Sequence, residues 1–231
     1  MSDDILDVGF LVLADISGFT AFVTRTELQH GAWATGSLLE TVMHRLAPPL
    51  EVQELEGDAV FALGPDRILP DGGALPAVLA GALAGFAEER RRLVSEPGCD
   101  CRACTSIADL DLKLIAHYGR FVRQFVGGRS RVAGPDVILV HRLLKNSVGA
   151  GEYVLLTEPA LAQARMDPSW SGMQRHVLRY PHFGAIACFV GDGGALRRRP
   201  THPSRQVEEL EERPSHVLLE RLGQWAQIGP K

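Results

Sequence analysis

The sequence has few cysteines, few aromatic residues and no long apolar segment. Its 231 residues include four cysteines and 6% aromatic residues, and the formal net charge is only −4. Three of the cysteines lie in one short loop, which is not the pattern of a secreted, disulfide-stabilised protein. A membrane-spanning helix needs roughly 18 apolar residues in a row, and the sequence has no such run. The sequence also lacks the excess of positive charge that is typical of nucleic-acid-binding proteins. We therefore expect a cytoplasmic protein with no membrane or nucleic-acid partner.

Common catalytic motifs are also missing. The sequence contains no G-x-S-x-G, H-E-x-x-H or Walker-type phosphate loop, so α/β-hydrolase, zinc protease and P-loop functions are not indicated. The hydrophobic fraction of 45% and the charged fraction of 23% are typical of soluble globular proteins. A chain of this length can bury a full core without disulfide or metal staples.

Apolar periodicity predicts a chain of alternating strands and helices. Strands are expected over 8–14, 50–55, 59–63, 110–116, 120–126, 153–156, 176–179 and 185–190. Helices are expected from 18, with Ser17 as N-cap, and over 37–46, 77–94, 137–144 and 158–164. Two strand pairs should form hairpins, the second with its turn at 117–119. This order predicts an α+β fold.

A change in composition divides the chain near its end. After about residue 191 the sequence is rich in Gly, Arg and Pro, which is typical of a linker or tail. We expect one domain over 1–194, with a cysteine loop at 98–106, and a C-terminal tail or arm over 195–231.

Two aspartates lie where predicted strands end. Asp15 follows the strand 8–14, and Asp58 lies at the tip of the hairpin built from 50–55 and 59–63. Carboxylates at one sheet edge suit Mg²⁺ or Mn²⁺ bound together with substrate phosphates. The backbone amides of 16–20, at the start of a helix, would add an anion site for a triphosphate. The alternative is that both aspartates only cap turns.

Four motifs, in the right order, resemble the catalytic domain of class III nucleotidyl cyclases. They are Ala14–Thr20 (ADISGFT), Leu55–Val60 (LEGDAV), Leu112–Gly119 (LKLIAHYG) and Val132–Val137 (VAGPDV). They are similar to the family's two metal-binding motifs, its basic-apolar-Gly-Ile-His-x-Gly strand and the approach to its dimer-arm helix. The resemblance covers about residues 7–190. It implies a ferredoxin-like cyclase fold, a mostly antiparallel sheet backed by helices, and a head-to-tail homodimer.

The resemblance also implies roles for single residues. Asp15, Asp58 and Ile16 would bind the metal, and Arg142 matches the arginine that stabilises charge in the transition state. A surface salt bridge is the alternative role for Arg142. The remaining candidate nucleotide contacts are Ser17, Gly18, Phe19, Thr20, Glu54, Arg131 and Arg179.

Three positions depart from the adenylyl cyclase pattern. Glu54 replaces the base-selecting lysine and resembles the glutamate of guanylyl cyclases, Ile138 replaces a ribose-orienting asparagine, and Arg131 fits neither class. Two readings therefore stay open. One is a divergent cyclase-like protein that binds a purine nucleoside triphosphate with metal, its purine nucleotide cyclase (phosphorus–oxygen lyase) activity kept, weak or lost. The other is a non-catalytic regulatory or scaffold module.

The cysteine loop is a separate candidate site. Cys99, Cys101 and Cys104 would hold Zn²⁺, with a histidine or Cys188 as the fourth ligand. A redox or disulfide loop and unliganded thiols are the alternatives. The segments 55–61 and 140–147 also resemble an uncharacterised group of bacterial cyclase-like proteins with a Cys-x-Cys-x-x-Cys loop, from which no function follows.

Overall fold

The computed structural model describes residues 5–95, 99–149 and 151–198. Its strands form one sheet in the order β2-β3-β1-β4-β6-β8-β7, and β5 pairs with β4 outside this path. All pairings are antiparallel except that of β4 with β6. The strands are β1 (Ile5–Ser17), β2 (Glu51–Glu56), β3 (Ala59–Pro65), β4 (Asp111–Val126), β5 (Arg129–Ala133), β6 (Tyr153–Thr157), β7 (Gln174–Tyr180) and β8 (Gly184–Asp192).

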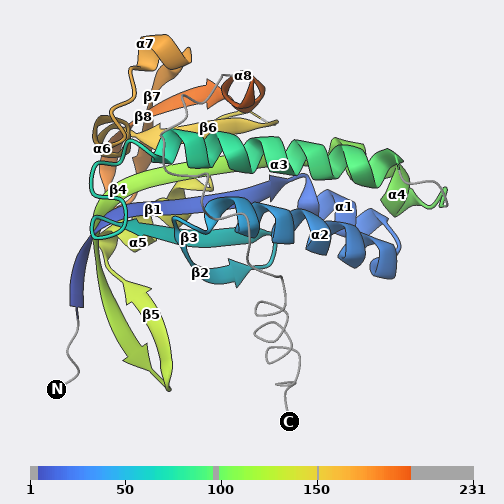
Figure 1. Ribbon diagram of the computed structural model, residues 1–231, viewed down its shortest axis with the longest axis horizontal. Coiled ribbons are helices and arrows are strands. Elements are labelled where there is room, and N and C mark those ends of the chain that lie inside the picture. Colours follow the sequence, from blue (N-terminus) through green and yellow to red (C-terminus); the bar gives the residue numbers. More distant parts are fainter. Residues whose placement is uncertain (1–4, 96–98, 150, 199–231) are drawn as a thin grey trace. The chain divides into compact units, whose positions relative to one another are not determined.

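Helices lie on both faces of this sheet. The long helices α2 and α3 pack against each other on one face, and α5 lies on the other (Figure 1). In α2, Leu38, Val42 and Leu46 recur at a spacing of four and are fully buried, as expected for a helix with one apolar face. The helices are α1 (Phe19–Arg25), α2 (Leu28–Leu46), α3 (Leu75–Ser95), α4 (Arg102–Ser106), the 3-10 turn η1 (Ile107–Asp109), α5 (Pro135–Leu143), α6 (Glu158–Gln163), α7 (Pro168–Ser171) and α8 (Gly193–Arg197).

The central strand β1 is buried on both sides, which explains its nearly continuous apolar sequence. Phe10 and Val12 pack with α2 and α3, whereas Leu11 and Leu13 pack with α5. Because side chains alternate along a strand, Asp15 lies on the same face as Leu11 and Leu13. We call this side of the sheet the α5 face.

The predicted hairpin over 110–126 is wrong. Residues 111–126 form the single strand β4, in which Gly119 pairs with Gly9 of β1. The hairpin turn lies between β4 and β5, at Gly127 and Gly128, whose φ angles are 59° and 77°. Positive φ at a turn favours glycine. Gly119, which was predicted to lie in the turn, lies inside β4 instead. A glycine within a strand is typical of a position where another chain segment approaches the backbone closely.

Near the end of the domain, α8 spans the predicted boundary at 194. Its Leu196 packs against the core on the side of α2 and α3. Residues 199–231 lie outside the described residues, so the C-terminal tail remains a prediction. None of the described helices is long and apolar enough to cross a membrane.

Candidate nucleotide and metal sites

Asp15 and Asp58 lie next to each other at one end of the sheet. Asp15 is the Cα partner of Ala59 in the pairing of β1 with β3, and the carbonyl oxygen of Asp58 accepts from the N–H of Ile16 at 3.2 Å. Burial, and then the negative charge of Asp15, raise the pKa of Asp58 above its usual range. The two carboxylates are therefore close enough for the charge of one to affect the pKa of the other.

Lys113 completes this group, and sequence reasoning did not include it among the site residues. It lies opposite Asp15 on β4, and its Nζ donates to Oδ2 of Asp15 at 2.8 Å. Nearby, the buried Ser17 Oγ has no hydrogen-bond partner in the part of the chain that the structure describes. Two carboxylates and a free hydroxyl fit a hard divalent cation that also binds phosphate oxygens. The only sequence signal for Lys113 was the basic position of the third motif.

The segment after Asp15 differs in detail from the prediction. β1 continues to Ser17, and the N-cap of α1 is Gly18, with φ of 85°, instead of Ser17. The N–H of Ile16 already donates to Asp58, so it is not free for a phosphate. Phe19 packs partly against the core, and Thr20 is exposed.

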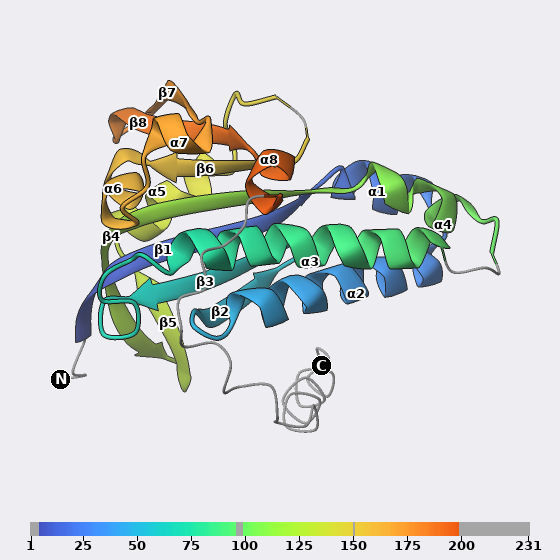
Figure 2. The same ribbon diagram turned by 45° about the horizontal axis from the view of Figure 1, so that its top comes forward.

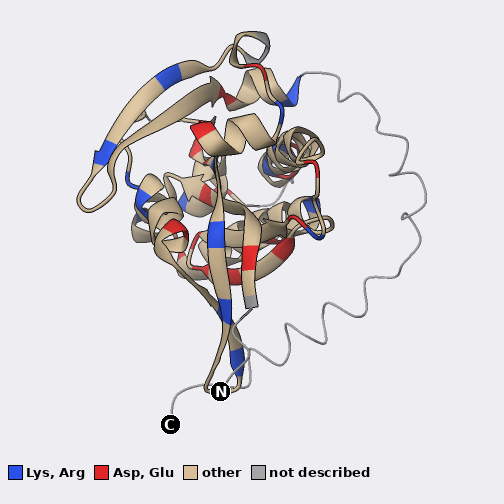
Figure 3. Cartoon of the chain, turned by 90° about the vertical axis from the view of Figure 1, so that its left-hand side faces the viewer, with Lys and Arg blue, Asp and Glu red and all other residues tan. Residues whose placement is uncertain are grey.

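A cavity of about 320 Å³ lies between β2, the β4–β5 hairpin and α5. Glu54 and Arg131, two of the predicted nucleotide contacts, both line it, and Nε of Arg131 lies 3.5 Å from Oε1 of Glu54. Glu54 on β2 pairs with Phe61 on β3, and Phe61 pairs with Leu13 on β1. Residues that pair across neighbouring strands point to the same face of a sheet. The cavity therefore lies on the α5 face, as Asp15 does. Figure 3 shows basic residues along the β4–β5 hairpin that forms one wall.

The other predicted nucleotide contacts do not join this cavity. Arg142 is exposed on α5, and no ion pair involves it among the residues described. Arg179 is exposed on β7, at the opposite end of the strand order from β2. Ile138 is 55% exposed on α5. Within one chain the structure therefore brings together Asp15 with Asp58, and Glu54 with Arg131, whereas Arg142 and Arg179 do not line the cavity.

The His-x-Gly motif of β4 has a structural role that joins β4 to β6 and α5. His117 is buried, with Nδ1 2.9 Å from Oγ1 of Thr157 and Nε2 3.2 Å from Oδ1 of Asp136. Burial lowers the pKa of His117, although Asp136 partly opposes this. A Cβ on Gly119 would lie 2.4 Å from Oδ2 of Asp136. The motif therefore makes room for the carboxylate that starts α5.

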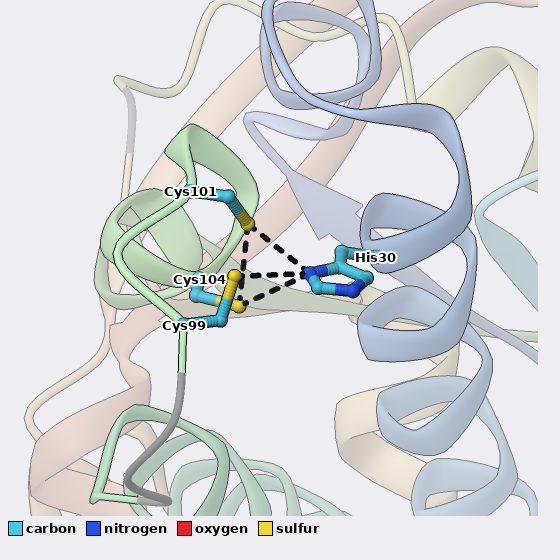
Figure 4. A group of neighbouring side chains, drawn as sticks. All are labelled: His30, Cys99, Cys101 and Cys104. Atoms are coloured by element: carbon cyan, nitrogen blue, oxygen red, sulfur yellow. Dashed lines mark hydrogen bonds between the residues drawn. The ribbon is translucent and has the colours of Figure 1, made fainter.

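The three loop cysteines form one group with His30 of α2 (Figure 4). Nδ1 of His30 lies 3.2 Å from Sγ of Cys101, 3.4 Å from Cys99 and 3.7 Å from Cys104. All four ligand atoms lie within 4.8 Å of one another. We call these four residues the cysteine cluster. Cys188, the other predicted fourth ligand, is buried on β8 and does not belong to it.

The thiols of the cluster differ in acidity. The backbone N–H of Cys104 is the main reason that the pKa of Cys101 is lowered to about 7. Burial is the main reason that the pKa of Cys104 is raised to about 12, and the neighbouring thiols add to it. The sequence predicted a histidine as one choice of fourth ligand but did not identify His30, because nothing in its spacing from the cysteines marks it as a ligand.

Solved structures similar to this chain include nucleotidyl cyclase domains. The guanylyl cyclase Cya2 superposes with a TM-score of 0.64 at 14% identity, over 81% of this chain and 92% of that chain. The adenylyl cyclase CyaB from P. aeruginosa superposes with a TM-score of 0.57 at 14% identity, over 82% and 96% of the two chains. The predicted α+β cyclase fold is thereby confirmed; at such identities the likeness extends to the fold alone.

Sequence comparison gives relatives without an assigned function. The "Uncharacterized protein Rv2561/Rv2562" of Mycobacterium tuberculosis is 34% identical over 125 residues, which are 52% of this chain and 56% of that protein. The chain thus spans about half the length of this curated relative. The family described as "Protein of unknown function (DUF2652)" matches residues 35–153, just over half of the 231 residues. The chain therefore belongs to the DUF2652 family.

Proposed function

We propose that this protein binds a purine nucleoside triphosphate together with Mg²⁺ or Mn²⁺, through Asp15 and Asp58. The observation that carries the proposal is the placement of both aspartates at the same end of the sheet, where Asp15 pairs with Ala59 and the N–H of Ile16 donates to the carbonyl oxygen of Asp58. The charge of Asp15 also adds to burial in raising the pKa of Asp58. A pair of close anions at the end of a sheet is stabilised by a divalent cation, which would in turn hold the phosphates. The carbonyl of Ile16 and the segment from Ser17 to Thr20 adjoin this metal position.

The cavity lined by Glu54 and Arg131 suits a guanine base. A carboxylate accepts hydrogen bonds from the N1–H and the amino group of guanine, and a guanidinium donates to its O6 and N7. Glu54 and Arg131 lie face to face across 3.5 Å and are both partly exposed, at 38% and 61% of their side chains. Such an exposed ion pair adds little stability of its own. A ligand could therefore separate it at small cost.

A second copy of the chain would complete the site. Arg142 and Arg179 do not line the cavity that Glu54 and Arg131 share, and the family resemblance implies that a head-to-tail partner supplies the arginine. Four large apolar side chains on strands and helix near the cavity are exposed, which is typical of a surface covered by a partner. They are Leu55, Phe125, Val126 and Ile138, exposed by 51%, 72%, 55% and 55%.

The residues of the site fit nucleotide binding with weak or lost cyclase activity better than they fit a fully active cyclase. Ile138 offers no hydrogen bond to a ribose, and Lys113 already occupies one oxygen of Asp15. The second candidate, a non-catalytic regulatory or scaffold module, is favoured by the same two observations. The two candidates differ in whether a nucleotide binds at all.

Thermal unfolding of the full chain with Mn²⁺, GTP and ATP, alone and in pairs, tests the proposal. A ligand at 100 times its Kd stabilises the native state by about 2.7 kcal/mol, so a nucleotide with Mn²⁺ should raise the midpoint clearly. The double variant Asp15→Asn/Asp58→Asn should lose the metal-dependent part of this shift. Asp109→Asn, at an exposed carboxylate, is the matched control and should keep it.

The outcomes separate the candidates. Absence of any shift with both nucleotides, or an equal shift in the double variant, would contradict the proposal and leave the scaffold module. If binding is found, an assay for cyclic GMP and cyclic AMP shows whether turnover accompanies it. Sedimentation of the protein with and without nucleotide tests the proposed homodimer.

A further inference from the structure

The cysteine cluster combines four ligand atoms from two segments that are far apart in the sequence. His30 comes from the first turn of α2. Cys99 and Cys101 come from the loop that leads from α3 into α4, and Cys104 comes from α4 itself. Figures 1 and 2 both place α4 beside the end of α2, and the contacts between these helices agree. Among the described residues, the cysteine cluster is the group of three or more His, Cys, Asp or Glu side chains whose ligand atoms lie close enough together to share one metal ion.

The interatomic distances fit one tetrahedral zinc ion. Zinc binds thiolate at about 2.3 Å and imidazole at about 2.0–2.1 Å, so a regular tetrahedron separates two sulfurs by about 3.8 Å and a sulfur from a nitrogen by about 3.6 Å. The sulfurs of Cys101 and Cys104 are 3.5 Å apart, and His30 Nδ1 lies 3.2–3.7 Å from the three sulfurs. We infer that His30, Cys99, Cys101 and Cys104 form a closed structural Zn²⁺ site that fastens α4 to α2.

Charge and ligand type point to the same ion. Three thiolates and a neutral imidazole carry a charge of −3, and Zn²⁺ lowers it to −1, with three protons released from the thiols. Soft sulfur ligands in tetrahedral geometry select Zn²⁺ over the hard cations proposed for Asp15 and Asp58. Because the protein supplies all four ligands, no position is left for substrate or water, and the site is structural instead of catalytic.

The loop is held in position by groups other than the ligands. The N–H of Ala103, at the start of α4, donates to Oε2 of Glu27 at 3.0 Å. Nε of Arg102 lies 3.7 Å from the other carboxylate oxygen of Glu27, and Ala103 itself is fully buried. These contacts place the three sulfurs around His30 before metal binds, which lowers the ordering cost of binding.

A disulfide does not account for the arrangement as well. A bond between Cys101 and Cys104 would need a separation of about 2.0 Å, and it would leave Cys99 and His30 without a role. The inference does not depend on nucleotide binding, because it involves neither Asp15 nor Asp58.

Metal analysis of the full chain, purified without a histidine tag, is the first test. We expect one zinc ion per chain in the parent protein. Cys101→Ser and His30→Ala should each weaken zinc binding by more than the roughly 10–100-fold that loss of an outer-shell partner costs. The matched controls are Cys188→Ala, a cysteine outside the cluster, and His44→Ala, an exposed histidine on the same helix. Both should keep the zinc.

A second measurement covers variants that fail to fold. Parent protein stripped by a chelator and refilled with Co²⁺ should show the ligand-field bands and the sulfur-to-metal charge-transfer band of tetrahedral cobalt with three thiolates. Four results would each overturn the inference. They are less than stoichiometric zinc after purification in zinc-containing buffer, a Cys101–Cys104 disulfide in the peptide map, iron with labile sulfide in place of zinc, and equal zinc loss in the Cys188→Ala control.

Discussion

The ammonium of Lys113 lies 2.8 Å from Oδ2 of Asp15, and the two side chains are only 22% and 16% exposed. The positive charge of Lys113 also lowers the pKa of Asp58, against the larger effects of burial and of Asp15 that raise it. Lys113 thus compensates the two aspartates while no metal is bound. It would also compete with an incoming metal for one oxygen of Asp15.

Replacing Lys113 by methionine should make the protein less stable without metal and more responsive to metal. The change removes the ammonium but keeps the length of the side chain. It leaves the largely buried carboxylate of Asp15 without its ion-pair partner, at a cost of about 1–3 kcal/mol. We expect a lower thermal midpoint in EDTA and a larger rise with Mn²⁺ than in the parent. Lys145→Met, at an exposed lysine, is the control. Equal Mn²⁺ shifts in parent and Lys113→Met would mean that Lys113 and metal do not compete.

Asp58→Asn should stabilise the metal-free protein at neutral pH. The pKa of Asp58 is raised in the folded state above its ordinary value of 3.8, so the folded protein binds this proton more tightly than the unfolded chain. The associated stability is fully present below pH 3.8 and is lost as the pH rises through the folded pKa. Ionised Asp58 therefore costs stability at pH 7, and asparagine removes that cost.

Urea unfolding in EDTA at pH 7 and near pH 3.5 measures this effect. The gain from Asp58→Asn should be seen at pH 7 and should shrink at the lower pH, where Asp58 is protonated in both states. Asp109→Asn serves again as the control. A loss of stability at pH 7 in Asp58→Asn would show that the carboxylate makes a favourable contact which outweighs its burial.

Gly119→Ala should destabilise the protein strongly although it adds one methyl group. The new Cβ would lie 2.4 Å from Oδ2 and 2.8 Å from Cβ of Asp136, so the start of α5 or strand β4 must shift. Overpacking of this kind costs typically about 1–3 kcal/mol. Gly36→Ala in α2, where a Cβ meets nothing within 4 Å, should instead be neutral or stabilising by up to ~1 kcal/mol. Urea unfolding of both variants makes the comparison, and a similar effect of the two would contradict the role of Gly119.

Gly119 also shows where sequence reasoning succeeds and where it fails. The β2–β3 hairpin was predictable because apolar strands stop at polar turn residues, and this placed Asp58 at its tip. β1 instead continues past its predicted end at residue 14, so Asp15 lies inside the strand. From the sequence alone, Gly119 is equally compatible with a turn and with a strand position where another chain segment approaches the backbone closely. Only the position of Asp136 in the folded chain decides between these readings.

The cysteine cluster marks a second limit. Three cysteines within one loop are visible in the sequence, but their partner His30 precedes them by 69 to 74 positions. The contact arises because α4 packs against α2, and tertiary packing of this kind leaves no spacing signal. The same holds for the pairing of Glu54 with Arg131, which depends on how the β4–β5 hairpin lies beside β2.

Glu54→Gln should weaken the binding of GTP more than that of ATP. The amide keeps the size of the side chain, but its NH₂ group can face the N–H donors of guanine, and the charge that pairs with Arg131 is lost. A good bidentate contact to a base is worth about 1–3 kcal/mol of discrimination, so the Kd for GTP with Mn²⁺ should rise about 5–150-fold. Glu56→Gln removes a charge from the same cavity, where Glu56 bonds to His141 at 3.0 Å, and should change both affinities little and equally. Calorimetric titration of both nucleotides into both variants and the parent provides the measurement. If Glu54→Gln weakened ATP and GTP to the same extent, the cavity would not read the base, and Glu54 and Arg131 would instead join β2 to the β4–β5 hairpin.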